Sequence, residues 1–249
     1  MSVLIDKSRA KAERLQKILA PGLRYSQWLY EEALREALKG AQSWLDIGCG
    51  HQVLPPWRQE AERELVASVN YVVGVDPDLE AIRKHTSIQN LVVGDVAQLP
   101  FADCNFDVVT ANMVVEHLPD TKVQFKEVCR VLKPGGVFLF HTPNLRGYPA
   151  LISQLLPDVV KRRLASFLED RSEADVYPTY YRANRREDIE DAAEAAGFDV
   201  QSIDYHCSTP ALSVVPALAA LELLYIRRLL RNERSHRQRP VIIGLLRKI

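Results

Sequence analysis

A short apolar run that ends in two closely spaced glycines is the feature that most restricts how this chain can fold. Ser43–Ile47 form the run, and Gly48-Cys49-Gly50 stops it. A run of this length next to glycine is typical of a buried parallel strand. Glycine allows the following turn to adopt positive φ and allows the backbone to approach a ligand closely. The feature therefore predicts a covered parallel sheet with a tight turn after one of its strands.

Strands and helices alternate along the rest of the chain. Apolar runs predict further strands over 71–75, 91–93, 106–111, 136–141, 198–203 and 241–246. Helical periodicity predicts helices over 30–40, over a segment with Phe125 and Leu132 on one face, and over 185–196, which Gly197 caps. We also expect helices over 7–20, where the pattern is weak, over 58–68, and in a short segment after Pro77. Right-handed crossovers between such strands predict an α/β fold with a doubly wound, seven-stranded, mostly parallel sheet.

The length of 249 residues fits a single domain over 1–249. Within it we expect N-terminal helices in 1–42, a helical lid insertion at 145–182 that rises over the site, and a helical insertion at 208–238 before the last strand. Ligands of doubly wound sheets bind at the carboxyl ends of the strands. The residues that directly follow each strand are therefore the candidates for function.

Acidic residues follow the first three strands in order. Asp46 lies in the glycine turn, Asp76 ends the second strand and Asp95 follows the third. An acid after the second strand of such folds accepts hydrogen bonds from ribose hydroxyls, and an acid after the third could accept one from an exocyclic amine. Each acid taken alone could equally be a helix cap. The three in order indicate a site for a nucleoside-containing cofactor.

These segments resemble the class I S-adenosylmethionine (SAM)-dependent methyltransferases, and within them the small-molecule group that includes ubiquinone and menaquinone methyltransferases. The resemblance is carried by LDIGCG, VVGVDPD, VVGDVAQLPF, FDVVTANMVVEHL and EVCRVLKPGGVFLFHTPN, from Trp44 to about His141, and by the tract from Tyr181 to Phe198. It implies a Rossmann-like fold with SAM as the cofactor. Asp46, Gly48 and Gly50 would surround the methionine portion, Asp76 the ribose, and Asp95 and the Val96 amide the adenine, while Asn112 and Met113 pass near the methionine portion and Cys49 and Pro77 complete the cofactor-binding set.

One stretch departs from the family pattern. His51-Gln52 stand where a further glycine is usual, and Pro55-Pro56 interrupt the helix that should follow. The departure motivates an alternative in which the protein binds SAM without methyl transfer, as a non-methylating catalyst or a regulatory binding protein. A dinucleotide-dependent oxidoreductase is a weaker alternative, because its G-x-G-x-x-G fingerprint requires glycine where this chain has Val53.

Residues that could act on the methyl acceptor lie near the fourth and fifth strands. His117 and His141 are candidate general bases, since histidine titrates near neutral pH, although each could instead be structural. Glu116, Tyr180, Tyr181 and Arg182 are candidate substrate contacts, and a tyrosine cluster that packs the lid is the alternative. The sequence thus predicts a SAM-dependent methyltransferase acting on a small-molecule or lipid-like acceptor, at oxygen, without a metal.

Charge and cysteine content limit the partners and the compartment. The 32 basic and 32 acidic residues balance, which argues against nucleic acid. The four cysteines have no metal-binding spacing and the N-terminus lacks a secretory signal pattern, so we expect a cytoplasmic protein. An apolar stretch from Pro210 to Ile226 precedes an arginine-rich stretch. Across 210–239 the alternatives are peripheral membrane contact and a helix that covers the sheet or a homodimer partner.

Overall fold

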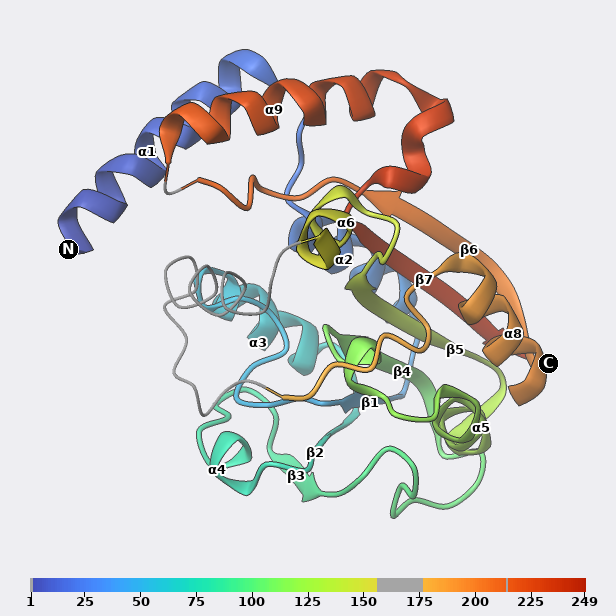
Figure 1. Ribbon diagram of the computed structural model, residues 1–249. Coiled ribbons are helices and arrows are strands. Elements are labelled where there is room, and N and C mark those ends of the chain that lie inside the picture. The colour runs from blue at the N-terminus through green and yellow to red at the C-terminus, as the bar shows by residue number, and fades with distance from the viewer. Residues whose placement is uncertain (1, 156–176, 214) are drawn as a thin grey trace. The chain divides into compact units, whose positions relative to one another are not determined.

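The computed structural model describes residues 2–155, 177–213 and 215–249 (Figure 1). The chain divides into two compact units. One unit consists of 27–142, 179–204 and 242–249, and it carries nearly all of the sheet. The other consists of 1–26, 143–178 and 205–241.

Seven strands form one sheet within the described residues, in the order β3-β2-β1-β4-β5-β7-β6. Their bounds are β1 Ser43–Ile47, β2 Tyr71–Asp76, β3 Asn90–Val93, β4 Phe106–Asn112, β5 Leu132–Pro143, β6 Phe198–His206 and β7 Val241–Lys248. The first five are paired in parallel, and β7 is antiparallel. All five residues of β1 are buried, as its apolar composition predicts for a central strand covered on both faces.

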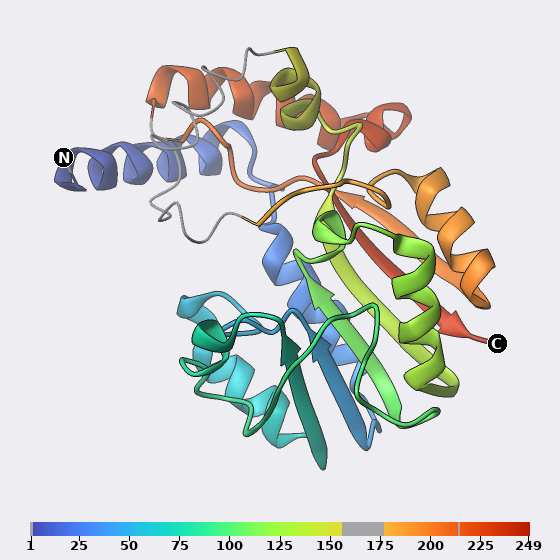
Figure 2. The ribbon, with the colours of Figure 1, turned by 60° about the horizontal axis from the view of Figure 1, so that its bottom comes forward.

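Helices cover the two faces of this sheet (Figure 2). The helices of the sheet-bearing unit are α2 Ser26–Ala37, α3 Gln59–Ala67, α4 Leu79–Ile82, α5 Thr121–Val131 and α8 Arg186–Ala196, with the 3₁₀ turns η1 Pro56–Arg58 and η2 Val115–His117. α2 and α3 place Tyr30, Leu34 and Leu65 in one apolar core with strand residues. α5 lies beside α8, and its Phe125 contacts Phe138 of β5 edge to face. This double cover leaves the strand ends as the place where polar groups can gather.

Capping groups set where several helices begin and end. The Asp78 carboxylate accepts hydrogen bonds from Glu80 N and Ala81 N at the start of α4. Gly197, with a φ of 85°, ends α8 in the left-handed conformation. The sequence predicted this glycine cap, and the structure confirms it.

In the other unit the described residues form the helices α1 Ser2–Leu19, α6 Tyr148–Leu155 and α9 Pro216–Arg231, followed by the 3₁₀ segment η4 Glu233–Gln238. α1 lies along α9 (Figures 1 and 2). Leu223, Ile226 and Leu229 of α9 are buried in a cluster with Ala20 and Leu23. None of the helices in the described part of the chain combines the length and apolar character needed to cross a bilayer.

The predicted fold class is confirmed: the sheet is doubly wound, seven-stranded and mostly parallel. The predicted start of the fifth strand is wrong, because β5 begins at Leu132 and not at Gly136. Leu132 is already paired with Phe106 of β4, and a register shift follows before Val108 pairs with Val137. The glycines therefore lie within an irregular part of the strand. In the predicted lid insertion, α6 occupies 148–155, and 156–176 lie outside the described residues.

Candidate functional site

The glycine turn after β1 is fastened to the end of β2. Gly48 N and Cys49 N both donate to Val75 O, at 2.7 and 3.2 Å. Gly48 has a φ of 65°, and a Cβ on it would lie 2.4 Å from Cγ2 of Val114. Gly50 has a φ of 49°, but a Cβ on it would meet no atom within 4 Å. Packing therefore requires glycine at 48, whereas Gly50 borders open space.

Asp76 joins this turn to the second strand end. Its Oδ2 accepts a hydrogen bond from Gly50 N at 2.9 Å, and its Oδ1 accepts one from Asp78 N at 2.8 Å. The contact forms because β1 and β2 are parallel neighbours in register, with Ile47 beside Val75. The predicted gathering of glycines and acids at one sheet edge is thus present in the backbone geometry.

Asp95 follows β3 at the same edge, since β3 is the parallel neighbour of β2. Its side chain is exposed, and Oδ1 accepts a hydrogen bond from Ala97 N at 2.8 Å. Val96 is buried beside it. Pro77 is exposed at the end of β2. The exposed Asp95 carboxylate therefore offers a hydrogen-bond acceptor to a ligand at this strand end.

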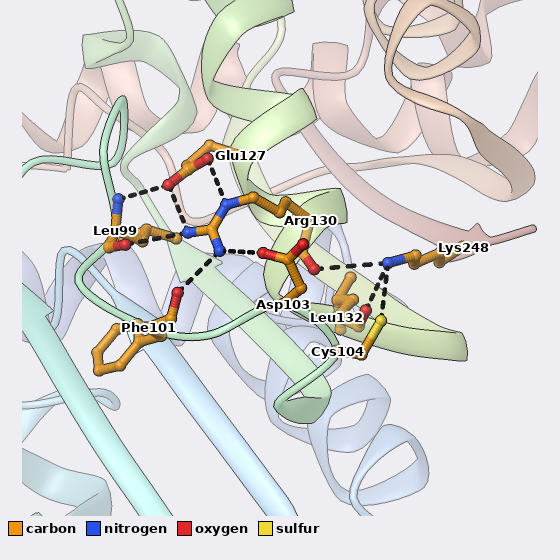
Figure 3. A network of polar contacts seen from close by, with 8 residues as sticks. All are labelled: Leu99, Phe101, Asp103, Cys104, Glu127, Arg130, Leu132 and Lys248. Atoms are coloured by element: carbon orange, nitrogen blue, oxygen red, sulfur yellow. Dashed lines mark hydrogen bonds and ion pairs between the residues drawn. The ribbon is translucent and has the colours of Figure 1, made fainter.

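Arg130 of α5 anchors the loop that follows β3 (Figure 3). Its guanidinium donates to Leu99 O at 3.0 Å and Phe101 O at 2.8 Å. It also contacts the carboxylates of Glu127 and Asp103, at 2.7 and 2.6 Å. Glu127 Oε1 accepts from Leu99 N at 2.8 Å. One side chain thus fixes the path of the loop after the third strand end.

The expected place of Asp46 in the glycine turn is wrong: it lies within β1, paired with Gly74 and Thr110, and is buried below the turn. Its Oδ1 accepts a hydrogen bond from the Thr110 hydroxyl, which in turn accepts one from Trp44 Nε1 at 2.7 Å. The pKa of Asp46 is raised to about 8: burial is the largest cause, the Thr110 hydrogen bond lowers the pKa in part, and the nearby carboxylates of Glu62 and Asp76 add to the rise. The carboxyl group therefore tends to be protonated at neutral pH, and a cationic ligand beside it would favour its ionised form.

Glu62 of α3 supports the chain where the family glycine is missing. This buried carboxylate accepts hydrogen bonds from Val53 N at 3.0 Å and Leu54 N at 2.8 Å, both through Oε2. Neither His51 nor Gln52 has a positive φ. The backbone at 51 and 52 therefore does not require glycine, and the two amides that follow donate to a side chain of α3. Sequence reasoning missed Glu62, because an acid in a first helical turn usually faces solvent.

Asn112, at the end of β4, has its side-chain amide engaged within the protein. It forms a reciprocal pair with the Gln27 amide at 3.0 and 3.3 Å and donates to Val53 O at 2.9 Å. Its Oδ1 also lies 2.8 Å from His141 Nδ1. Met113 is exposed with a φ of 60°, and its amide donates to His141 O at 2.8 Å. Asn112 thus holds the glycine loop in place, and Met113 is the residue whose side chain is open to contact.

His141 is buried, and its ring stacks on Tyr30 with centroids 5.6 Å apart. His117 belongs to η2 and has a side chain 30% exposed, with Nε2 4.0 Å from Glu116 Oε1. The two predicted candidate bases therefore differ in access: solvent reaches His117, whereas the His141 ring is enclosed.

Glu116 connects several of the predicted substrate residues. Its backbone oxygen accepts hydrogen bonds from Tyr180 N at 2.8 Å and Tyr181 N at 3.1 Å. Its buried Oε2 accepts from the Thr142 hydroxyl at 2.9 Å. Tyr181 has a φ of 53°, which turns the chain sharply at this contact. Arg182 follows on the exposed side of that turn. Glu116 and the two tyrosines thus form one local cluster in the sheet-bearing unit.

Among the described residues, no three histidine, cysteine, aspartate or glutamate side chains form a group that could hold a metal ion.

The sequence is similar to those of known methyltransferases. Residues 45–140 match the sequence family described as a methyltransferase domain. A probable S-adenosylmethionine-dependent methyltransferase of Mycolicibacterium smegmatis is 38% identical over 105 residues, which is 40% of this chain and 37% of that protein. A malonyl-[acyl-carrier protein] O-methyltransferase of Hamiltonella defensa is 33% identical over 103 residues, 41% and 38% of the two chains. A demethylmenaquinone methyltransferase of Corynebacterium efficiens is 30% identical over 155 residues, 60% and 64% of the two chains.

The chain spans less than two thirds of the length of these curated relatives. Among solved structures, an S-adenosylmethionine-dependent methyltransferase of Mesorhizobium loti aligns with a TM-score of 0.52 at 17% identity, covering 87% of this chain and 96% of the other. At that identity the likeness concerns the fold, and it agrees with the strand order of the sheet.

Proposed function

Because the chain belongs to the class I SAM-dependent methyltransferases, whose methyl donor is SAM, we propose that it transfers a methyl group from SAM to a small-molecule or lipid-like acceptor, at an oxygen atom. The observation that carries the proposal is the hydrogen bond from Gly50 N to Asp76 Oδ2. This contact joins the turn after β1 to the acid at the end of β2, so the two segments that would bind the methionine and ribose portions of SAM are held together.

The chain's own residues fit a cationic cofactor. SAM carries a sulfonium and an ammonium group. The buried carboxylates of Asp46, Glu62 and Asp76 lie close enough for the latter two to raise the pKa of Asp46. A positive charge beside them would offset their mutual repulsion. The open space beside Gly50 leaves room for such a ligand at the turn.

The proposed cofactor contacts follow from these positions. Asp46, Gly48, Cys49, Gly50 and Met113 would hold the methionine portion, Asp76 and Pro77 the ribose, and Asp95 and Val96 the adenine, with Asn112 supporting the loop. The sulfonium of SAM supplies an activated methyl group. The chain's task is therefore to hold the acceptor oxygen at attack distance and angle, an effect that can be worth several kcal/mol.

His117 is the better placed candidate general base, because part of its ring is open while His141 is enclosed by Tyr30. It would take the proton from an acceptor hydroxyl. Glu116, Tyr180, Tyr181 and Arg182 would contact the acceptor, and His141 would orient Asn112. The names of two relatives support the acceptor class: one acts on demethylmenaquinone, a lipid-like molecule, and the other methylates oxygen of malonyl-[acyl-carrier protein].

The alternative without methyl transfer was motivated by His51-Gln52. Glu62 supports that loop through hydrogen bonds to Val53 N and Leu54 N. The departure at His51-Gln52 is therefore no longer a physical reason to prefer the alternative without methyl transfer. Methyl transfer is therefore the function that we put forward.

Calorimetric titration with SAM and with S-adenosylhomocysteine tests cofactor binding. We expect both to bind, and Asp76→Ala to weaken both by at least about tenfold. Transfer of a labelled methyl group from SAM to phenol, quinol and carboxylate acceptors then tests the reaction. His117→Ala should lower kcat about 100-fold or more while the Kd of SAM is unchanged. Absence of binding to both ligands would contradict the proposal, and binding without transfer to any acceptor would restore the alternative.

A further inference from the structure

Helix α9 has two apolar faces, and residues of the described segments 2–155, 177–213 and 215–249 cover one of them. Ala219, Leu223 and Ile226 are buried on the face toward the cluster shared with the end of α1. Leu218, Leu221, Leu224 and Tyr225 are exposed on the opposite side, with Leu221 65% and Leu224 47% exposed. Residues three and four apart are neighbours on a helix surface. These four side chains therefore form a continuous apolar strip, which we call the outer strip.

Arginines continue the outer strip toward the end of the helix. Arg228 and Arg231 are exposed in the last turn of α9, and Arg234 is exposed just beyond it. These three make no ion pair within 2–155, 177–213 and 215–249. Since residue 228 lies seven positions after Leu221, the positive charge is on the same side of the helix as the exposed leucines.

Two acids on α9 and directly after it, in the part of the chain that the structure describes, have partners. Glu222, the one acid in α9, is buried and accepts hydrogen bonds from the Tyr148 hydroxyl and from Ala211 N and Leu212 N. Glu233 contacts Arg239 at 3.3 Å. The outer strip thus combines exposed leucines with positive charge that α9 itself does not neutralise.

We propose that the outer strip binds the surface of an anionic lipid bilayer, with the leucines entering the acyl region and the arginines contacting lipid phosphates. Helices with an exposed apolar face and flanking arginines bind at the boundary between the lipid headgroups and the acyl chains. The 16 residues of α9 span about 24 Å, short of the roughly 30 Å of hydrocarbon that a spanning helix must cross. The helix therefore lies along the surface. This inference stands on the residues of α9 and does not depend on methyl transfer.

A second copy of the chain fits the outer strip less well than a bilayer does. Pairing two outer strips would bring the arginines of both copies together, while Glu222, the one acid of α9, is buried. Nucleic acid would satisfy the arginines but would leave Leu218, Leu221 and Leu224 against a charged backbone. An anionic bilayer satisfies the charge and the apolar side chains together.

Sedimentation with vesicles tests this binding. The probes are vesicles of phosphatidylcholine alone and vesicles of phosphatidylcholine with about 30% phosphatidylglycerol, which adds negative surface charge. We expect the full chain to bind the anionic vesicles at least about tenfold more tightly than the neutral ones. Raising the salt concentration should weaken this preference, because screening shortens the reach of the arginine charges.

Two variants and a matched control separate the contributions. Leu221→Glu should lower the partition coefficient on both vesicle types by about tenfold or more, whereas Arg228→Glu should lower it about fivefold or more on anionic vesicles only. Val123→Glu with Lys126→Glu places equivalent changes on the exposed face of α5, where Val123 is 48% exposed. This control should bind like the unchanged chain. Circular dichroism should show the same helix content in all variants, since the changed side chains are exposed.

The proposal fails if the unchanged chain binds neither vesicle, or binds both equally. It also fails if Leu221→Glu and Arg228→Glu bind as tightly as the control. Analytical ultracentrifugation without lipid gives the remaining outcome: a dimer that Leu221→Glu dissociates would assign the outer strip to a second copy of the chain.

Discussion

Gly48 and Gly50 both have positive φ, yet their surroundings predict different costs for an added methyl group. A left-handed backbone costs a non-glycine residue about 1–2 kcal/mol. Gly50→Ala adds only this, because its Cβ would meet no atom within 4 Å. Gly48→Ala also forces a Cβ to 2.4 Å from Val114 Cγ2, and overpacking of this kind adds about 1–3 kcal/mol. We therefore expect losses of about 1–2 kcal/mol for Gly50→Ala and about 2–5 kcal/mol for Gly48→Ala.

Urea unfolding followed by circular dichroism measures both losses by linear extrapolation. The variant Val114→Ala completes a double-mutant cycle, since it removes the side chain that the new Cβ would strike. In that background Gly48→Ala should cost about as much as Gly50→Ala does in the unchanged chain. Equal losses for the two single variants, or no recovery in the double variant, would refute the reasoning. SAM affinity gives a second readout, and Gly50→Ala should weaken it because the new methyl group occupies space beside Asp76.

Three further changes give distinct readouts. Asp46 has a pKa of about 8 in the folded chain and about 3.8 when unfolded, so its contribution to the free energy of unfolding falls as pH rises between these values, by up to about 1.4 kcal/mol per pH unit. Asp46→Asn should therefore reduce the change in the free energy of unfolding between pH 5.5 and 7.5, measured by urea unfolding. An unchanged pH dependence would contradict this prediction. Glu62→Ala leaves two buried amides without their acceptor and should cost about 2–5 kcal/mol, with Glu62→Gln costing less; equal effects would mean that the hydrogen bonds contribute little. Arg130→Met should cost about 2 kcal/mol by freeing the loop after β3 (Figure 3), measured by urea unfolding, and hydrogen exchange in 97–103 should rise; unchanged exchange there would argue against the anchoring role.

The elements that the sequence predicted well are those whose pattern is local. The bounds of β1 were predicted correctly because a short apolar run stops at Gly48, and the end of α8 because a helical pattern stops at Gly197. The start of β5 was misplaced because Pro134 and the two following glycines read as a break, while pairing with β4 begins earlier, at Leu132. Pairing with a distant strand leaves no local signature.

The polar supports of the site were harder to foresee. Glu62 and Gln27 belong to helices, where glutamate and glutamine usually face water. Their partners, the Val53 and Leu54 amides and the Asn112 side chain, come from other segments of the chain. Which buried polar groups meet depends on the tertiary fold. The sequence therefore located the strand ends but not the side chains that hold the loops between them.

The Glu62 support also bears on how sequences of this kind can diverge. Where an acid at 62 receives the amides of 53 and 54, positions 51 and 52 need no special backbone conformation. We therefore expect these two positions to vary among homologues that keep the acid. Homologues with glycine at 52 should be free to lose it. Covariation between positions 52 and 62 would indicate that this loop can be formed either with glycine at 52 or with an acid at 62.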